Sequence, residues 1–144
     1  MKNKEKTIKT ILLGAGIIAV LFFYYQLNTV GYVSGSSRRA IESQVFEISE
    51  VEAAMNVVEQ KFEEDFTGCS LIDLWYDETF SQTYSTEWAK QYNADEAIIL
   101  LSTFHVGSTW VGEDLEANTT YPSWQWILVR NASDDTWRLE TWGY

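Results

Sequence analysis

Three side chains of chemically active types lie within or beside apolar stretches of the sequence. Asp73 and Tyr76 belong to the stretch 69–76, and His105 lies near the end of the stretch 97–106. An aspartate that lines a desolvated pocket can act as a general base, so Asp73 is a candidate for that role. The alternative is a carboxylate on the solvent face at a sheet edge. His105 is the single histidine, so it predicts neither a catalytic triad nor a histidine-rich metal site.

The other metal-ligating residue types predict no cofactor site. Cys69 is the only cysteine, which excludes an internal disulfide and a cysteine-rich metal site. We interpret it as a small buried residue at the start of a strand, since no basic neighbour in sequence would activate the thiol. Glu113, Asp114 and Glu116 could hold calcium, but their spacing matches no known calcium loop. We therefore expect no metal and no cofactor.

Tryptophan is concentrated near the end of the sequence, where the stretch 121–144 holds four of the seven in the chain. The pattern predicts two strands joined by a polar turn at 131–135. Strand alternation leaves Trp142 and Tyr144 on one face, where a partner could contact them. The other tryptophans are expected to form an inner wall against the helices; they are Trp124, Trp126 and Trp137.

Hydrophobic periodicity predicts the elements that position these residues. Apolar residues at helical spacing predict a helix over 49–66, where Ser49 and Glu52 match a capping box. Aromatic residues at every fourth position predict a second helix over 80–92, with its aromatic stripe in the core. Strands are expected at 69–76, at 97–106 and in both arms of the C-terminal hairpin.

The predicted order of elements, α-β-α-β-β-β, indicates the fold class. It is typical of an α+β domain in which helices cover one face of a sheet. We therefore expect residues 44–144 to form a curved, mainly antiparallel, four-stranded sheet packed by two helices.

The N-terminal part of the sequence predicts attachment to a membrane. Residues 1–9 form a basic region with four lysines, and the uncharged residues 10–27 approach the length of a transmembrane helix. Lysines before such a helix favour a cytoplasmic N-terminus. We expect an uncleaved signal anchor in the cell membrane, then a flexible linker at 28–43 and a domain outside the cytoplasm. The alternative is a cleaved signal peptide and a secreted domain.

The charge distribution excludes one class of partner. From Ser43 onward the chain has 19 acidic and four basic residues, a net charge of −15. A field of this sign repels the phosphates of nucleic acids, so we expect no nucleic-acid binding. The expected partners are the membrane, through the single span, and another membrane or envelope protein.

Several short runs between Ser49 and Tyr144 carry a resemblance to a known group of domains. They are Gly68-Cys69-Ser70-Leu71, Tyr76-Asp77-Glu78, Asp95-Glu96-Ala97-Ile98, Leu101-Ser102-Thr103-Phe104, Trp126-Ile127-Leu128-Val129-Arg130 and Trp137…Trp142-Gly143-Tyr144. With them the chain resembles uncharacterised membrane-anchored bacterial domains, which are similar in outline to the cone-shaped, nuclear-transport-factor-2-like fold. Enzymes of that fold use Asp, His or Tyr inside the cone. No residue here stands in a recognisable motif, so the resemblance implies a fold and no activity.

Three functions from different classes are compatible with the sequence. The preferred one is a membrane-tethered module that binds a protein or a small ligand and carries out no catalysis. The first alternative is a cone-fold enzyme with Asp73 or His105 as general base. The second is carbohydrate or cell-wall binding through exposed tryptophans. The candidate binding residues are Asp73, Tyr76, His105, Trp142 and Tyr144.

Overall fold

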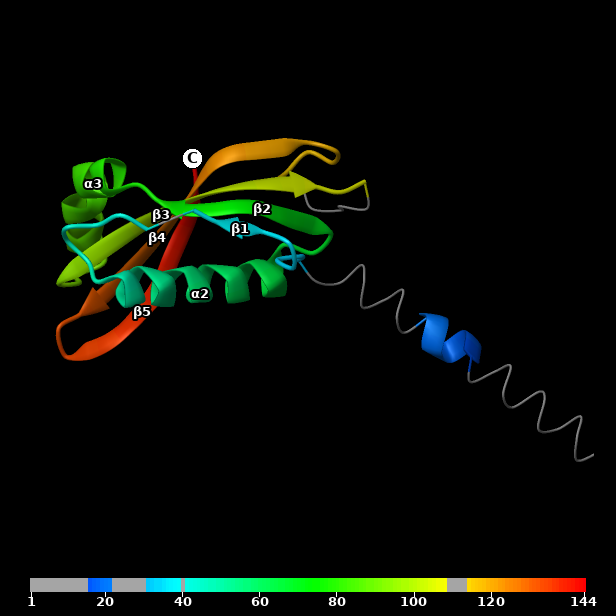
Figure 1. Cartoon of the computed structure of the whole chain (residues 1–144), viewed down its shortest axis with the longest axis horizontal. Helices are drawn as coiled ribbons and strands as arrows, with labels where there is room; N and C mark the ends of the chain where they lie inside the picture. Colours follow the sequence, from blue (N-terminus) through cyan, green and yellow to red (C-terminus); the bar gives the residue numbers. More distant parts are fainter. Residues whose placement is uncertain (1–15, 22–30, 40, 109–113) are drawn as a thin grey trace, which may run out of the picture.

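Five strands form one mixed sheet at the centre of the structure, in the order β1-β2-β3-β4-β5 (Figure 1). The computed structural model describes residues 16–21, 31–39, 41–108 and 114–144. The predicted α+β class is confirmed, but the sheet has five strands and not four. The elements are β1 (Ser37–Arg38), α2 (Ile48–Asp65), β2 (Cys69–Tyr76), α3 (Glu78–Gln91), β3 (Glu96–Val106), β4 (Thr120–Asn131) and β5 (Asp134–Gly143).

The additional strand lies within the expected linker, 28–43. β1 pairs in parallel with β2, with Ser37 beside Asp73, whereas the other neighbouring strands are antiparallel. The Asp73 carboxylate holds β1 at this edge, because it accepts hydrogen bonds from the Ser37 hydroxyl at 2.9 Å and from the Arg39 guanidinium at 2.5 Å. These contacts join residues far apart in the sequence, and the local Gly- and Ser-rich composition does not reveal them.

The two helices pack on opposite faces of the sheet, and not on one face as predicted. Ile98 of β3 belongs to the main core with Phe62 of α2. Its neighbour Ala97 packs against Ala89 of α3 in a second, smaller cluster. Because successive side chains of a strand point to opposite faces, the helices must lie on different sides. Figure 1 shows α2 running along the sheet and α3 at one end of it.

The aromatic stripe of α3 is not the buried face of that helix. Its buried residues are Ser81 and Ala89, whereas Tyr84 is 44% exposed. The Ser81 hydroxyl accepts a hydrogen bond from the backbone N–H of Ile99 at 3.0 Å. Small residues let the helix lie close to the sheet, so the large rings remain at its margin. The prediction that the stripe packs in the core is wrong for Tyr84.

A β-bulge in β2 changes which of its side chains share a face. Pairing with β3 steps from Leu71 to Asp73, so Ile72 is an extra residue in this strand. Leu71 and Leu74 are both buried in the core beside α2, whereas Ile72 is 46% exposed. Leu71 and Asp73, two positions apart, therefore lie on different faces of the strand.

A second bulge, in β5, has the same effect on the C-terminal hairpin. Ile127 pairs with Thr141 and Leu128 pairs with Leu139, so Glu140 is the extra residue. Beyond the bulge, Trp142 pairs with Trp126 and shares its face. The prediction that Trp142 points away from the inner face is therefore wrong.

α2 begins at Ile48, one residue before the predicted start. Its capping box is formed by Glu47 and Glu50, and not by the predicted serine and glutamate two residues later. The Glu50 carboxylate accepts a hydrogen bond from the Glu47 N–H at 2.7 Å, which satisfies an exposed helix-end donor. Arg130 of β4 binds the same carboxylate at 2.5 Å. This tertiary contact favours the earlier start.

The expected signal anchor, 10–27, lies mostly outside the described residues. Residues 16–21 of it are described and are helical. Within the described part of the chain, no helix combines the length and the apolar character needed to cross a bilayer.

Gly31, in the expected linker, gives a test of how this segment packs. Its N–H donates to the Glu63 carbonyl at 3.0 Å, and a Cβ at this position would lie 2.1 Å from the Phe62 carbonyl oxygen. We expect Gly31→Ala to lower the free energy of unfolding by about 2 kcal/mol, because the segment must move away from α2. Urea denaturation measures the effect. Ser34→Ala, at an exposed site of the same segment, is the control, and an equal loss in both variants would contradict the packing.

Candidate binding pocket

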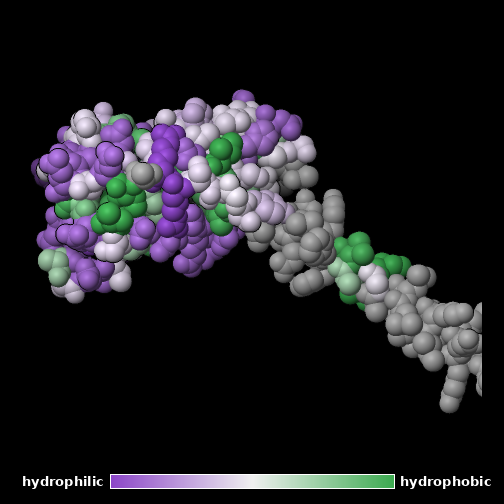
Figure 2. Space-filling view, viewed as in Figure 1, coloured by the Kyte–Doolittle hydropathy of each residue, from purple (hydrophilic) through white to green (hydrophobic). Residues whose placement is uncertain are grey.

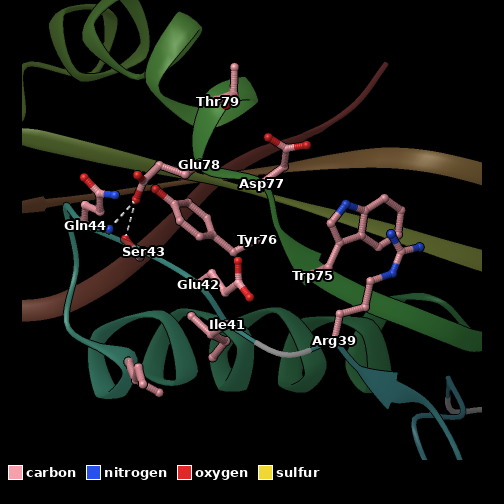
Figure 3. A pocket seen from close by; sticks show the side chains of 11 residues that line it. Arg39, Ile41, Glu42, Ser43, Gln44, Trp75, Tyr76, Asp77, Glu78 and Thr79 are labelled. Atoms are coloured by element: carbon pink, nitrogen blue, oxygen red, sulfur yellow. Dashed lines mark hydrogen bonds between the residues drawn. The ribbon is translucent and has the colours of Figure 1, made fainter.

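A pocket of about 700 Å³ lies between the segment that follows β1 and the junction of β2 with α3 (Figure 3). We call it the Tyr76 pocket. Volumes of this size are typical of sites for small ligands or for short pieces of a partner. Its lining residues are Arg39, Ile41, Glu42, Ser43, Gln44, Ile48, Trp75, Tyr76, Asp77, Glu78 and Thr79.

The Tyr76 side chain provides the most unusual group of this pocket. The residue is 8% exposed, and its hydroxyl oxygen is buried without a hydrogen-bond partner among the described residues. Burial raises the pKa of the phenol; the nearby hydroxyls of Ser43 and Ser81 lower it and the carboxylate of Glu78 raises it, but none of these groups meets the geometry of a hydrogen bond to the phenol. Figure 3 shows the hydroxyl end of Tyr76 directed toward both of these residues. The phenol is therefore protonated at neutral pH and can donate a hydrogen bond.

Carboxylates dominate the charge of the pocket. Glu78 accepts hydrogen bonds from the Ser43 hydroxyl and the Gln44 N–H, both at 2.7 Å (Figure 3). The Ser43 bond is the main reason that the pKa of Glu78 is lowered. Asp77 caps α3 by accepting from the Phe80 N–H at 2.9 Å. A lowered pKa keeps the Glu78 carboxyl ionised, so this wall of the pocket attracts cations.

Arg39 forms the opposite wall. Its guanidinium lies 3.7 Å from the centroid of the Trp75 ring and pairs with Asp73 at 2.5 Å. The stacking and the ion pair fix the orientation of the guanidinium and offset its charge. Glu42, Asp77 and Glu78 therefore leave the pocket with an excess of negative charge.

Asp73 does not line this pocket, although the sequence made it a candidate base. One of its carboxylate oxygens accepts from Ser37 and the other from Arg39. A base needs an oxygen that can reach the proton of a substrate. In this structure Asp73 instead joins β1 to β2.

His105 lies on the sheet face opposite α2, because its neighbours Phe104 and Val106 are buried on the α2 side. Its Nδ1 lies 3.1 Å from the Thr120 hydroxyl, which is within hydrogen-bond distance. It pairs in register with Ser70 and is not among the residues that line the Tyr76 pocket. The structure therefore does not bring His105 and Tyr76 into one site.

Trp142, near the end of β5, and Tyr144, just after that strand, belong to an aromatic cluster. Trp142 is 37% exposed and Tyr144 is 71% exposed. The Trp142 ring lies 6.0 Å from that of Trp126, and the Tyr144 ring lies 5.1 Å from that of Trp124. The five candidate residues are thus divided among separate places, and of these five Tyr76 is the one that lines the pocket described above.

The other tryptophans that the structure describes do not form an exposed platform. Trp126 and Trp137 are buried, as the hairpin alternation predicted, and Arg39 lies over Trp75. Of the tryptophans in the described ranges, Trp142 is the only exposed one. Trp110 lies outside these ranges. Carbohydrate binding requires at least two exposed coplanar rings, so the described residues give it little support.

The structure also shows the surroundings of Cys69 and of the described part of the acidic stretch 113–116. Cys69 is buried, and burial raises the pKa of its thiol to about 11, so the thiol is protonated at neutral pH. Glu113 lies outside the described residues, whereas Asp114 and Glu116 are exposed. Within the ranges 16–21, 31–39, 41–108 and 114–144, no three His, Cys, Asp or Glu side chains are arranged to hold a metal ion.

The sequence interpretation missed most of the residues of the Tyr76 pocket. Arg39, Glu42 and Ser43 fall in the range assigned to a flexible linker, 28–43, which therefore received no functional role. The sequence did contain one signal for this pocket: the acidic residues Asp77 and Glu78 lie directly between a predicted strand and a predicted helix. Polar residues at such a junction are placed together at the edge of a sheet.

No family model matches the chain, and no curated protein or solved structure is significantly similar to it. The resemblance to nuclear-transport-factor-2-like domains therefore stays a prediction. The function has to be inferred from the geometry described above.

Proposed function

We propose that this protein is a membrane-tethered, non-catalytic binding module, which holds a basic segment of another membrane or envelope protein in the Tyr76 pocket outside the cytoplasm. The observation that carries the proposal is the buried, unpartnered hydroxyl of Tyr76. A buried polar group without a partner costs about 1–3 kcal/mol. Such groups are rare in folded proteins unless something binds them. A ligand backbone carbonyl that accepts from this hydroxyl would remove the cost, once the Ser43 or Glu78 side chain moves aside to expose the buried oxygen.

The charge of the pocket supports a basic ligand. Glu42, Asp77 and Glu78 line it, and Arg39 is already paired with Asp73. The domain as a whole is acidic, with −15 from Ser43 onward. A field of this sign increases the rate at which a cationic partner arrives.

Exposed apolar side chains beside the pocket support a protein partner. Ile48, which lines the pocket, is 57% exposed, and the nearby Val45 is 52% exposed. Figure 2 shows hydrophobic surface near the start of α2, surrounded by hydrophilic surface. An apolar patch with a polar rim is typical of an interaction site.

The N-terminal sequence supports the proposed location of the domain outside the cytoplasm. The lysines of residues 1–9 precede the uncharged segment 10–27, a pattern that favours an anchor with the domain on the outer side. A tethered domain meets partners that lie in or near the same membrane. A basic segment of another membrane or envelope protein is therefore the expected ligand.

Catalysis has less support than binding. Both oxygens of the Asp73 carboxylate are engaged by Ser37 and Arg39, and His105 does not line the Tyr76 pocket. An enzyme of the cone-fold type would require one of these residues to face a substrate in a shared cavity. The binding function needs neither of them.

Peptide binding by the Tyr76→Phe variant tests the proposal. The probes are fluorescent nine-residue peptides with two lysines or arginines among apolar residues, and matched peptides with glutamate at the same positions. We expect the basic peptides to bind the full chain in a maltoside detergent, and Tyr76→Phe to weaken them about tenfold, because a hydrogen bond is lost. Anisotropy titrations measure the affinity.

Tyr84→Phe is the matched control, because Tyr84 is exposed on α3 and does not line the pocket. Thermal unfolding should show Tyr76→Phe to be as stable as the natural chain or more stable, since the removed hydroxyl has no partner. Equal binding of basic and acidic peptides, or unchanged affinity in Tyr76→Phe, would disprove the proposed function.

A further inference from the structure

A second pocket, of about 340 Å³, lies at the other end of α2 and has a different chemistry. We call it the aromatic pocket. Three rings line it: Phe66 follows α2, Trp124 belongs to β4 and Trp142 to β5. Its other lining residues are Asp65, Asp114 and Leu115. Its size is at the lower end of the range for small-molecule sites.

The rings of this pocket are held in place by further aromatic contacts. Trp142 packs against Phe66 at 6.3 Å and against Trp126 at 6.0 Å between ring centroids. Trp124 packs edge-on against Phe104 at 5.4 Å. The walls are therefore preorganised, and a ligand does not have to order them.

The polar groups of the pocket select the charge of its ligand. Asp65 and Asp114 are the ionisable residues that line it, and both are exposed at its rim. Aromatic faces attract cations, and a pair of carboxylates adds to that attraction. Three rings with carboxylates at the rim match the arrangement that recognises quaternary ammonium groups.

The protein already places a cation on one of these rings. The ammonium of Lys61 lies 5.3 Å from the centroid of Trp142 and pairs with Asp65 at 2.7 Å. Lys61 itself does not line the pocket. A positive charge can thus sit beside the Trp142 ring, and Lys61 competes with a ligand for the Asp65 carboxylate.

We propose that the aromatic pocket binds a quaternary ammonium group, with Phe66, Trp124 and Trp142 around the methyl groups and Asp65 and Asp114 balancing the charge. Such a group is large and weakly hydrated, so it gains more from aromatic faces than a primary amine does. The carboxylates favour a free cation, such as choline, over a phosphocholine headgroup that carries its own anion.

This site is separate from the Tyr76 pocket and does not depend on the function proposed for it. Ile48 lines the Tyr76 pocket and Asp65 lines the aromatic pocket. The two residues are the first and last of α2, so about 25 Å separates the sites along the helix. A Tyr76→Phe variant should bind quaternary ammonium compounds as the natural chain does.

The test uses choline and its uncharged isostere, 3,3-dimethylbutan-1-ol, which has the same shape. Saturation-transfer NMR on the methyl signal of either compound reports its binding to the full chain in maltoside detergent. We expect choline to bind at least about tenfold more tightly than the isostere. Phosphocholine should bind more weakly than choline. Equal binding of choline and the isostere, absence of choline binding, or tighter binding of phosphocholine would each overturn the proposal.

Variants locate the site and separate binding from folding. Trp142→Ala should weaken choline about tenfold, and Trp142→Phe should weaken it less. Asp114→Asn, at an exposed position that should not disturb folding, should weaken it several-fold. Lys61→Met should strengthen it, because a competing cation is removed. Trp88→Ala, on α3, is the control. Unchanged affinity in both Trp142→Ala and Asp114→Asn would contradict this location.

Discussion

Replacing Trp126 with alanine is expected to lower the free energy of unfolding by about 4 kcal/mol, one of the largest effects that a single substitution can have here. Trp126 has no exposed surface, and its ring contacts Phe62, Phe66 and Trp142. The variant leaves a large cavity between α2 and the sheet. Urea denaturation with fluorescence of the remaining tryptophans measures the loss.

The hydrogen bond of the indole adds a second, separable contribution. The Trp126 N–H donates to the Ser102 hydroxyl at 2.8 Å, and Ser102 is also completely buried. Ser102→Ala alone should cost about 1–2 kcal/mol, because the buried N–H loses its partner. In a Trp126→Phe background the same change should cost much less, because no donor remains. Trp88→Ala, at a half-buried position on α3, is the control, and a loss as large as that of Trp126→Ala would contradict this account of the core.

Replacing Arg130 with methionine is expected to lower the free energy of unfolding by about 2 kcal/mol at neutral pH. The free energy of unfolding of this variant should also fall less when the pH is lowered. Arg130 is 9% exposed and binds Glu50 at 2.5 Å and Glu96 at 3.1 Å. Its guanidinium also lies 4.3 Å from the centroid of the Trp137 ring. Methionine keeps the apolar stem but removes the charge, so two carboxylates face each other without a cation. Because both are partly exposed, we expect less than the full cost of breaking a buried ion pair.

The sign of the pH effect follows from Glu50. The hydrogen bond from Arg130 is the largest cause of its lowered pKa, followed by a backbone hydrogen bond from Glu47. A lowered carboxyl pKa stabilises the fold above the ordinary value of 4.5, and this contribution is lost as the pH falls through the folded value. The natural chain should therefore lose stability as the pH falls below 4.5 toward the lowered pKa of Glu50. Below pH 4.5 the urea midpoint should fall less in Arg130→Met than in the natural chain, and an equal fall would contradict the coupling.

Local patterns in the sequence predicted most of the elements of this fold. β2 has the predicted bounds, and α2 and β3 begin within one residue of the predictions. These elements follow from hydrophobic periodicity and from breakers such as Gly68, which adopts a positive φ of 76° just after α2. Such signals involve residues that are close together in the chain, so they can be recognised in a single amino-acid sequence.

Features that depend on register could not be predicted in the same way. The bulges at Ile72 and Glu140 each insert one residue, and side chains beyond them change face. Strict alternation therefore placed Trp142 on the wrong side. A bulge depends on how a strand fits its partner, and the strand's own residues do not encode it alone.

The Tyr76 pocket was hidden for a related reason. Arg39 lies beside it because β1 pairs with β2, and the Asp73 carboxylate supports that pairing together with backbone hydrogen bonds. The sequence made Asp73 and Tyr76 candidate residues of the strand 69–76. It could not show that Asp73 would bind Arg39 and Ser37, whereas the hydroxyl of Tyr76 would remain without a partner.

The bulge in β5 also affects how the domain behaves at high concentration. β1 and β5 are the edges of the sheet, and an exposed edge strand can pair with another molecule and start aggregation. β1 is two residues long, and β5 is interrupted at Glu140, where Arg138 binds the extra residue. A short strand and a charged, bulged strand are poor templates for a sixth strand. The sheet therefore has protected edges, and partners are expected to reach the domain through its pockets and not by strand addition.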